Sequence, residues 1–381
     1  MASLPRVVII MRYIVHYRAP VFDMLIERAR DRYEVAVYGK LDGEEAFGGG
    51  KRDYYKHIPW EQTKVAGVGI ERWPTLIPTV KEEKPEVLIA TLNPRSPDCW
   101  KLPKVCRQTG TSLCGWSKIH SVSPFPDFAT DILKRRLFKG YESIICYGHA
   151  SAKELADLGF AKDRIFTANN TIDTRRIFDE SEQFADSAKK LREEHGLADK
   201  KVLLYIARMD PDKRFEDVLE AWPKLRQLDD ELTLVLAGSG QLENELREKA
   251  KQIDPDRILF IGKVPEGHDY LWIRAADIMI QCGMTGLAIN QSMAFGVPTV
   301  IADEEGVDTE ILEHDVTGWR YEKANLDSMV AMVDRVLKNS EERDRITNTA
   351  IDRMQNEITI ENMVVNIDAC ITDALARRNG R

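Results

Sequence analysis

The sequence alternates between short apolar runs and longer segments whose apolar residues have helical spacing. The first half holds six such runs, rich in β-branched residues, at 7–11, 33–38, 87–92, 112–116, 143–147 and 164–168. The second half holds five more, at 202–207, 232–237, 258–263, 277–281 and 298–302. Parallel strands covered on both faces have this near-continuous apolar character, and strands that alternate with helices form right-handed βαβ units. The sequence therefore predicts an α/β fold with two doubly wound, Rossmann-like sheets.

A charged, weakly apolar segment at 179–200 separates the two series of predicted strands. We therefore predict an N-terminal domain over residues 1–180 and a C-terminal domain over 181–357. Helical periodicity near the end of the chain predicts a helix within 358–381 that crosses back to the N-terminal domain. A chain of 381 residues has the length of two ordinary domains, which is consistent with this division.

Composition excludes several classes of protein. With 43% hydrophobic and 30% charged residues the chain is globular, and it lacks the run of about 18 apolar residues that a membrane helix needs. The run at 7–11 is short and has no small-residue cleavage site behind it, so we interpret it as a strand and not as a signal peptide. The six cysteines have no metal-like spacing, which favours reduced thiols in a cytoplasmic protein.

Charge is distributed unevenly along the chain. Residues 1–180 contain 28 Lys and Arg against 23 Asp and Glu, whereas residues 181–381 contain 26 against 39. This asymmetry argues against general nucleic-acid binding and indicates that only the first half meets an anionic partner. Within that half, residues 127–139 form a predicted basic amphipathic helix, which could bind an anionic membrane surface or a lipid pyrophosphate. A solvated helix face is an equal alternative.

The predicted strand at 202–207 is followed by a short loop with two cations, Arg208 and Lys213. A helix is predicted to begin near Arg214, so both cations lie at the carboxyl end of a strand, where open α/β sheets bind ligands. Two positive charges there can neutralise a diphosphate leaving group. By position alone, a solvated basic turn explains the same residues equally well.

Five further segments follow this loop in order. In one-letter code they are LVLAGSG from 234, LFIGKVP from 259, YLWIRAAD from 270, GLAINQSMAFGVPTV from 286, and EIL from 310 with TGW from 317. In this order and spacing they resemble the C-terminal domain of retaining GT-B glycosyltransferases, specifically glycosyltransferase family 4. The resemblance continues into residues 141–155 and 170–173 and covers roughly 140–335. It implies a GT-B fold, in which two Rossmann-like domains face a cleft.

The resemblance also implies roles for residues of the donor site. The donor diphosphate would be held by two cations and by the N–H groups of a helix N-terminus, namely by Arg208, Lys213, Gly286 and Leu287. The nucleoside would be held through main-chain groups and one side chain: Gly262, Lys263, Val264 and Gln291. The donor sugar would lie against the loop and helix formed by Gly283, Met284, Thr285 and Asn290.

One departure from the family affects the sugar and ribose contacts. Members normally carry two glutamates eight positions apart, the first on the donor sugar and the second on the ribose, and here these positions are Gly283 and Gln291. A glutamine still hydrogen-bonds a hydroxyl, through neutral bonds roughly half as strong as charge-assisted ones. On this basis Gln291→Glu should preserve or tighten nucleotide binding. Gly283 offers no side chain, so Asn290 or the backbone of 284–287 holds the sugar, or the donor differs, or activity is lost.

Two histidines compete for the catalytic role in the first domain. His120 follows the predicted strand that ends at Trp116 and resembles the family's histidine near the reacting sugar, although a loop histidine is incidental as often as not. Residues 13–20 are bulky and aromatic where family members often have a glycine-rich loop. His16, Tyr17 and Arg18 in that loop are candidates for contact with the acceptor.

The resemblance thus implies a retaining glycosyltransferase that uses a UDP- or GDP-sugar and a glycan or lipid-linked acceptor in cell-surface polysaccharide or glycolipid biosynthesis. It implies no metal and no other cofactor. From the cysteine and charge patterns we expect a cytoplasmic location, with possible contact at the inner membrane face, and no nucleic-acid partner. The Asp-x-Asp triplets at 210–212 and 254–256 contain central prolines, so we interpret them as turns and not as metal ligands. A nucleotide-sugar 2-epimerase and a catalytically silent GT-B homologue or binding subunit remain as alternatives.

Overall fold

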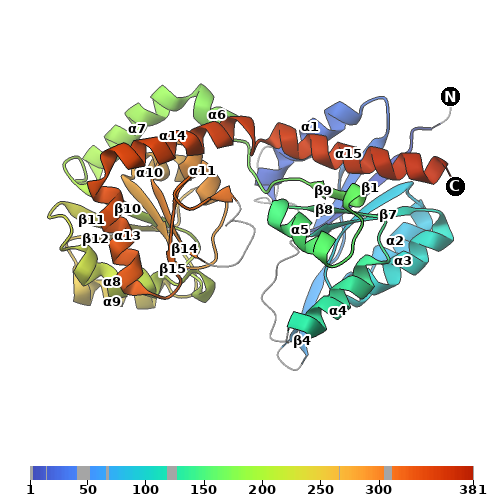
Figure 1. Ribbon diagram of the computed structural model, residues 1–381, viewed down its shortest axis with the longest axis horizontal. Coiled ribbons are helices and arrows are strands. Elements are labelled where there is room, and N and C mark those ends of the chain that lie inside the picture. Colours follow the sequence, from blue (N-terminus) through green and yellow to red (C-terminus); the bar gives the residue numbers. More distant parts are fainter. Residues whose placement is uncertain are drawn as a thin grey trace. The chain divides into compact units, whose positions relative to one another are not determined.

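The computed structural model describes residues 3–13, 15–40, 52–65, 68–117, 127–265, 267–303 and 311–380. The chain folds into two compact units, each with a sheet between layers of helices (Figure 1). Unit 1 comprises Met1–Asp173 and Ile360–Arg381, and unit 2 comprises Thr174–Thr359. The division falls shortly before the predicted boundary at residue 180, because α6 (Arg175–Asp179) packs against α7 (Ser181–Glu194) and α11 (Ala288–Ala294) of unit 2.

The main sheet of unit 1 has seven parallel strands in the order β3-β2-β1-β6-β7-β8-β9. They are β1 (Arg6–Tyr13), β2 (Glu34–Lys40), β3 (Tyr55–His57), β6 (Val87–Thr91), β7 (Ser112–Ser117), β8 (Ser143–Cys146) and β9 (Ile165–Thr167). A separate antiparallel pair consists of β4 (Glu61–Val65) and β5 (Val68–Arg72). The strand order of the main sheet changes direction between β1 and β6.

Alternate residues of β1 enter two different cores, as expected for a strand that is covered on both faces. Val8 and Ile10 pack toward α2 (Leu76–Glu83) and α3 (Pro97–Thr109), while Val7 and Ile9 pack toward α1 (Ala19–Ala29) and α15 (Ile360–Asn379). The buried residues of α15 recur every three or four positions: Ile360, Met363, Val364, Ile367, Cys370, Ile371 and Ala374. The last helix of the chain therefore completes the core of unit 1, alongside α1 (Figure 1).

A buried carboxylate also ties α15 to the start of the chain. The side chain of Asp368 is 7% exposed and accepts hydrogen bonds from Arg28 Nε at 2.8 Å, from Arg32 Nη2 at 2.7 Å and from the Tyr33 hydroxyl. Burial alone would raise the pKa of Asp368, but the hydrogen bonds from Tyr33, Arg28 and Arg32 outweigh it and hold that pKa below its usual value. The carboxylate is therefore kept in its charged form.

The sheet of unit 2 has six parallel strands in the order β12-β11-β10-β13-β14-β15. They are β10 (Lys201–Ile206), β11 (Leu232–Ala237), β12 (Ile258–Gly262), β13 (Ile278–Gln281), β14 (Thr299–Asp303) and β15 (Trp319–Glu322). Counted from β10, the order is 3-2-1-4-5-6, the arrangement of dinucleotide-binding sheets. It changes direction between β10 and β13.

Helices cover both faces of this second sheet. They are α7, α8 (Phe215–Leu225), α9 (Glu243–Ile253), α10 (Asp269–Ala275), α11, α13 (Leu326–Lys338) and α14 (Ser340–Asn356). Leu203 and Tyr205 of β10 belong to one core, while Val202, Leu204 and Ile206 belong to the other. Of the helices that the structure describes, none combines the length and apolar character needed to cross a membrane.

The predicted α/β fold with two doubly wound sheets is confirmed, and all eleven predicted runs contain a strand. Four strands were not predicted: β3, β4, β5 and β15. The strands β3 and β15 lie at sheet edges and are only three and four residues long, too short to form an apolar run. The pair β4–β5 is polar in sequence and lies outside the parallel sheet.

Candidate functional site

The predicted cations lie where the strand order of unit 2 changes direction. Residues 207–214 follow β10 and residues 282–287 follow β13, and these two strands are neighbours in the sheet. Loops at such a point lead away from each other to opposite faces of the sheet, which leaves room for a ligand at its carboxyl edge. Arg208 and Lys213 on the first loop and Gly283 to Leu287 on the second therefore share the edge at which this fold binds ligands.

Direct hydrogen bonds hold the two loops together. Lys213 Nζ donates to the Met284 carbonyl at 2.6 Å, and the Met284 N–H donates to the Asp212 carbonyl at 2.9 Å. Beneath them the buried Tyr205 hydroxyl accepts from the Cys282 N–H at 3.2 Å and donates to the Lys213 carbonyl. The positions of the two loops are therefore coupled.

Gly283 is required by the close approach of these loops. A Cβ atom at this position would lie 2.2 Å from the Asp212 carbonyl oxygen and 2.8 Å from the Lys213 carbonyl carbon. At Gly238 and Gly240, a Cβ would lie 1.8 Å from the Ala207 oxygen and 2.6 Å from the Met209 backbone. The loop after β10 therefore contacts the backbone of Gly238 and Gly240 on one side and that of Gly283 on the other. No side chain fits at position 283.

The two cations differ in their surroundings. The Arg208 side chain is 78% exposed, and its Nη2 lies 3.4 Å from Asp210 Oδ2. The Lys213 side chain is only 12% exposed, and its Nζ lies 3.6 Å from Asp212 Oδ2. Arg208 is thus free to reach a ligand, whereas Lys213 is directed by the Met284 carbonyl.

Both Asp-x-Asp triplets lie in turns. Pro211 to Lys213 forms a short 3-10 helix after Asp210, so each aspartate of the first triplet lies beside one of the two cations. In the second triplet, Asp254 follows α9 and accepts a hydrogen bond from Trp222 Nε1 at 3.0 Å. These contacts give the aspartates of the first triplet a role in balancing the charge of the cationic loop.

The residues predicted to hold the nucleobase lie on the neighbouring loop. Gly262 ends β12 with a φ of +80°, and its carbonyl accepts from the Gly238 N–H at 2.8 Å. Lys263 is exposed, and Val264 packs against the core. The loops after β10, β11 and β12 are therefore connected through their backbones along one edge of the sheet.

The residues that follow β13 differ in exposure. Gly286 has open space around it, since a Cβ would meet nothing within 4 Å, and Leu287 immediately precedes α11. Met284 is 46% exposed and Thr285 is half-buried. Asn290 is fully buried at 0% exposure, which gives no support to the prediction that its amide contacts the donor sugar.

Gln291 contacts a carboxylate that sequence reasoning missed. Its Nε2 donates to Asp269 Oδ2 at 2.7 Å, and Gln291 is only 8% exposed. Asp269 is the first residue of α10, and among the described residues its Oδ1 is buried without a hydrogen-bond partner. No motif marks Asp269, because an aspartate in the first turn of a helix is commonplace. A glutamate at position 291 would face this carboxylate, which reverses the expectation that Gln291→Glu preserves nucleotide binding.

In unit 1, the structure gives Arg18 a structural role in place of the predicted acceptor contact. Arg18 is 4% exposed and donates to the Thr171 carbonyl at 3.2 Å, to Met363 Sδ at 3.1 Å and to Asn170 Oδ1. Its guanidinium therefore joins the loop after β1 to the segment after β9 and to α15. Tyr17 lies beside it, with its ring centroid 5.5 Å from the Arg18 guanidinium carbon. The side chain of His16, and His120 as a whole, lie outside the described residues, so their roles stay predictions.

Aromatic and cationic side chains gather at the carboxyl ends of β1 and β2. The guanidinium of Arg12 lies 5.1 Å from the Trp60 ring centroid and pairs with Glu71. The Tyr13 ring meets the Trp60 ring edge-on at 5.1 Å, and Lys40 Nζ lies 5.9 Å from the Tyr13 ring. Sequence reasoning missed this group because Trp60 and Glu71 lie in or beside the unpredicted β4–β5 pair. It occupies the edge of the unit 1 sheet at which a ligand is expected.

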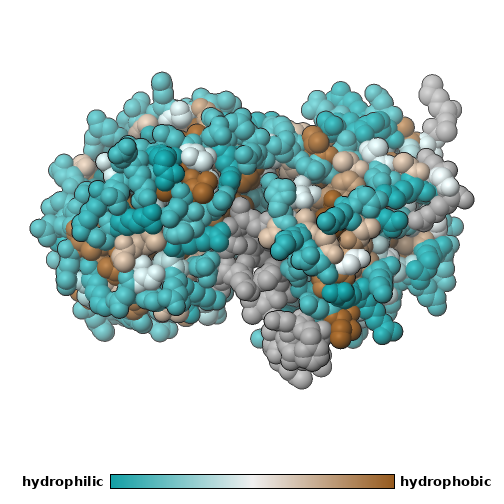
Figure 2. Space-filling view, in the orientation of Figure 1, coloured by the Kyte–Doolittle hydropathy of each residue, from teal (hydrophilic) through white to brown (hydrophobic). Residues whose placement is uncertain are grey.

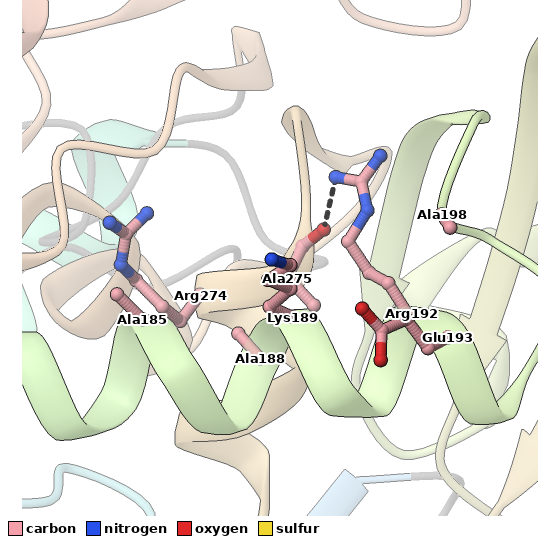
Figure 3. A pocket seen from close by; sticks show the side chains of 8 residues that line it. All are labelled: Ala185, Ala188, Lys189, Arg192, Glu193, Ala198, Arg274 and Ala275. Carbon is pink, nitrogen blue, oxygen red and sulfur yellow. Dashed lines mark hydrogen bonds between the residues drawn. The ribbon is translucent and has the colours of Figure 1, made fainter.

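A surface hollow of about 230 Å³ lies between α7 and α10, at the opposite end of α10 from Asp269 (Figure 3). Its lining residues are Ala185, Ala188, Lys189, Arg192, Glu193, Ala198, Arg274 and Ala275. Arg192 Nη1 donates to the Ala275 carbonyl at 3.0 Å. Since Ala275 ends α10 shortly before β13 begins, this hollow lies at the amino edge of the sheet and is separate from the site described above.

The match to a protein-family model lies within unit 2. Residues 187–353 match the family model of glycosyl transferases group 1. The chain is 28% identical over 172 residues to alpha-monoglucosyldiacylglycerol synthase of Streptococcus pneumoniae (strain ATCC BAA-255 / R6), covering 41% of this chain and 38% of that protein. It is 25% identical over 245 residues to N-acetyl-alpha-D-glucosaminyl L-malate synthase of Bacillus anthracis, covering 62% and 61%. The chain thus spans less than two thirds of each of these relatives.

Similarity in fold extends over nearly the whole chain. Anabaena HepE, solved in complex with UDP, superimposes with a TM-score of 0.72 at 15% identity, covering 97% of this chain and 100% of that one. The same protein in complex with UDP-glucose gives a TM-score of 0.70, also at 15% identity with 97% and 100% coverage. The predicted GT-B fold is therefore confirmed.

Proposed function

We propose that this chain is a retaining glycosyltransferase that moves a sugar from a UDP- or GDP-sugar to a glycan or lipid-linked acceptor. The observation that carries the proposal is the coupled pair of loops at the switch point of unit 2, with Arg208 and Lys213 on one and an open Gly286 on the other. The match of this unit to glycosyl transferases group 1 supports the reaction class. The UDP bound by HepE supports the donor class, and the names of the relatives support a role in polysaccharide or glycolipid biosynthesis.

The chemistry that these residues supply is charge neutralisation. When the bond between the sugar and the diphosphate breaks, negative charge builds up on the departing phosphate oxygens. The exposed Arg208 side chain can contact those oxygens, while Lys213 is held at the base of the loop by the Met284 carbonyl. In this proposal the two side chains supply the positive charge that a metal ion supplies elsewhere, so the reaction needs no metal.

The test is donor-dependent release of free UDP or GDP by the full chain, with and without acceptor extracts. A transferase releases nucleotide and labels an acceptor, and Arg208→Ala should lower both rates. Arg274→Ala is the matched control, because it removes an arginine of the same unit at the opposite edge of the sheet. An isomerised nucleotide-sugar without acceptor labelling would favour a 2-epimerase, and nucleotide binding without turnover would favour a silent homologue.

We also propose that unit 1 contacts an anionic membrane surface through α4 (Asp127–Phe138). Ile132 and Leu133 are 60% and 48% exposed, and apolar surface is visible in the region of α4 (Figure 2). Arg136 and Lys139 are exposed nearby and have no ion-pair partner among the described residues. Exposed apolar side chains flanked by free cations are the features of an interfacial helix.

Vesicle sedimentation tests this contact. The full chain should bind vesicles rich in phosphatidylglycerol more tightly than purely phosphatidylcholine vesicles. Serine at positions 132 and 133 should abolish the difference, whereas Val365→Ser, which changes a 43% exposed apolar residue on α15, should not. Equal binding of the double variant and the parent would overturn the contact.

A further inference from the structure

We propose that Asp269 is the carboxylate that accepts hydrogen bonds from the ribose hydroxyls of the bound nucleotide, and that Gln291 is the residue that positions it. The inference rests on the proposed donor site in unit 2. It moves the ribose contact from α11 to the first turn of α10. It also changes the role of Gln291. In place of a weaker hydrogen bond to the ribose, Gln291 positions the carboxylate that contacts the ribose.

The first observation is the hydrogen bond between the two side chains. Gln291 Nε2 donates to Asp269 Oδ2 at 2.7 Å, the length of a charge-assisted hydrogen bond. Gln291 is 8% exposed on α11, which packs against α10, so its amide is held by its surroundings. A glutamate at position 291 would place two carboxylates within hydrogen-bond distance, where both cannot stay ionised without cost. A carboxylate at 269 therefore requires an amide or another donor at 291.

The second observation is the other oxygen of the same carboxylate. Asp269 Oδ1 is buried and accepts no hydrogen bond from any described residue. A buried charged oxygen without a partner is unfavourable, so a donor from outside the described residues, such as a ligand hydroxyl, would stabilise it. Asp269 as a whole is partly exposed. In this proposal the Asp269 side chain shifts when the nucleotide binds, so that one carboxylate oxygen accepts from the ribose while Gln291 stays bonded to the other.

The third observation is the place of Asp269 in the fold. The chain leaves β12 at Gly262, passes through 263–268 and enters α10 at Asp269, so this residue lies at the carboxyl edge of the sheet. The backbone of the same loop is bonded to the Gly238 turn, which in turn supports the cationic loop. A carboxylate that lies on this edge, apart from the two cations, suits a neutral polyhydroxyl group and not a phosphate. The ribose of a nucleoside diphosphate is such a group.

The experiment compares ribonucleotides with their deoxy counterparts on the full chain, by calorimetry with UDP, GDP, 2′-deoxy-UDP and 2′-deoxy-GDP. A hydrogen bond to a carboxylate gives about a tenfold to hundredfold preference for the ribonucleotide. The parent chain should show that preference, and Asp269→Asn should bind the two forms with nearly equal affinity. Gln291→Glu should weaken ribonucleotide binding through repulsion. The exchanged pair, Asp269→Asn with Gln291→Glu, should restore both affinity and preference, which a merely structural role would not predict.

Controls separate this inference from the proposed function. Arg274→Gln changes the same helix at its other end and should leave the preference intact. If Asp269→Asn does not fold by circular dichroism, Asp269→Ser replaces it, and loss of preference is again the expected result. A preference that survives loss of the carboxylate, or an exchanged pair no better than Gln291→Glu alone, overturns the inference while the donor site stands. Failure of the parent to bind either ribonucleotide overturns the proposed function itself.

Discussion

At residue 283 the absence of a side chain has a steric cause. The backbone of 212–213 occupies the space that a Cβ would fill, so a glutamate at this position is incompatible with the observed loop. The sequence revealed that a family glutamate was missing but not why, because the reason is a contact between segments about 70 residues apart. The hydrogen bonds from Gln291 to Asp269 and from Arg18 to Thr171 also join residues far apart in the sequence, so they could not be predicted from it. The cations were predictable, since a strand, two positive charges and a helix follow one another directly.

The steric account predicts opposite outcomes at two neighbouring glycines. Gly283→Ala should destabilise the chain by about 1–3 kcal/mol or more, because its Cβ would lie 2.2 Å from a backbone oxygen that cannot rotate away. Gly286→Ala should change stability by less than about 0.5 kcal/mol, because the added methyl group meets nothing within 4 Å. Urea denaturation of both variants measures the difference. Equal stabilities would contradict the loop contact.

Replacing Lys213 should lower the free energy of unfolding more than replacing Arg208. Lys213→Ala removes the charged hydrogen bond to the Met284 carbonyl and should cost about 1.5–3 kcal/mol of unfolding free energy. Arg208→Ala removes a 78% exposed side chain with a long ion pair and should cost less than about 1 kcal/mol. Thermal melts without ligand provide the comparison. A larger loss for Arg208→Ala would show that the roles of anchor and ligand contact are assigned the wrong way round.

At the scale of elements, the strands that sequence patterns revealed are those buried on both faces. β6, β10 and β11 consist almost entirely of buried residues, and their apolar runs are recognisable in the sequence. The edge strands β3 and β15 are too short to produce such a run, and the β4–β5 pair is polar in sequence. As a result, the aromatic and cationic group around Trp60 could not be assembled from the sequence. The last helix could be predicted because its apolar spacing is regular, and burial against α1 and against β7 to β9 explains that spacing.

The attachment of α15 should depend on pH through Asp368. Its pKa in the folded chain lies below the ordinary aspartate value of 3.8, so its contribution to stability is fully present above that value. The contribution is lost as the pH falls through the folded pKa, because protonation then favours the unfolded chain. Asp368→Asn should therefore cost about 1.5–3 kcal/mol at pH 7, with a gap to the parent that narrows below pH 3.8. Denaturation series at pH 7 and between pH 4 and 2.5 test this, and a constant gap would count against it.

At the scale of the whole molecule, the candidate binding residues form two separate groups, one at each of the two parallel sheets. Unit 2 carries the coupled loops, the cations and the Gln291–Asp269 pair, and it holds the whole region that matches glycosyl transferases group 1. Unit 1 carries the aromatic group at the end of β1 and the exposed apolar residues of α4. Under the proposed function, the second unit would bind the donor and the first would bind the acceptor.

The central claim is that the loop with Arg208 and Lys213 binds the diphosphate of a nucleotide. The most direct measurement is a calorimetric titration of UDP and of GDP into the full chain, repeated with Arg208→Ala and with Arg274→Ala. We predict that the parent binds at least one of the two nucleotides. Arg208→Ala should then weaken that binding about tenfold or more, the worth of a charged hydrogen bond, while Arg274→Ala leaves it unchanged. No binding of either nucleotide by the parent, or equal binding by Arg208→Ala, would contradict the claim.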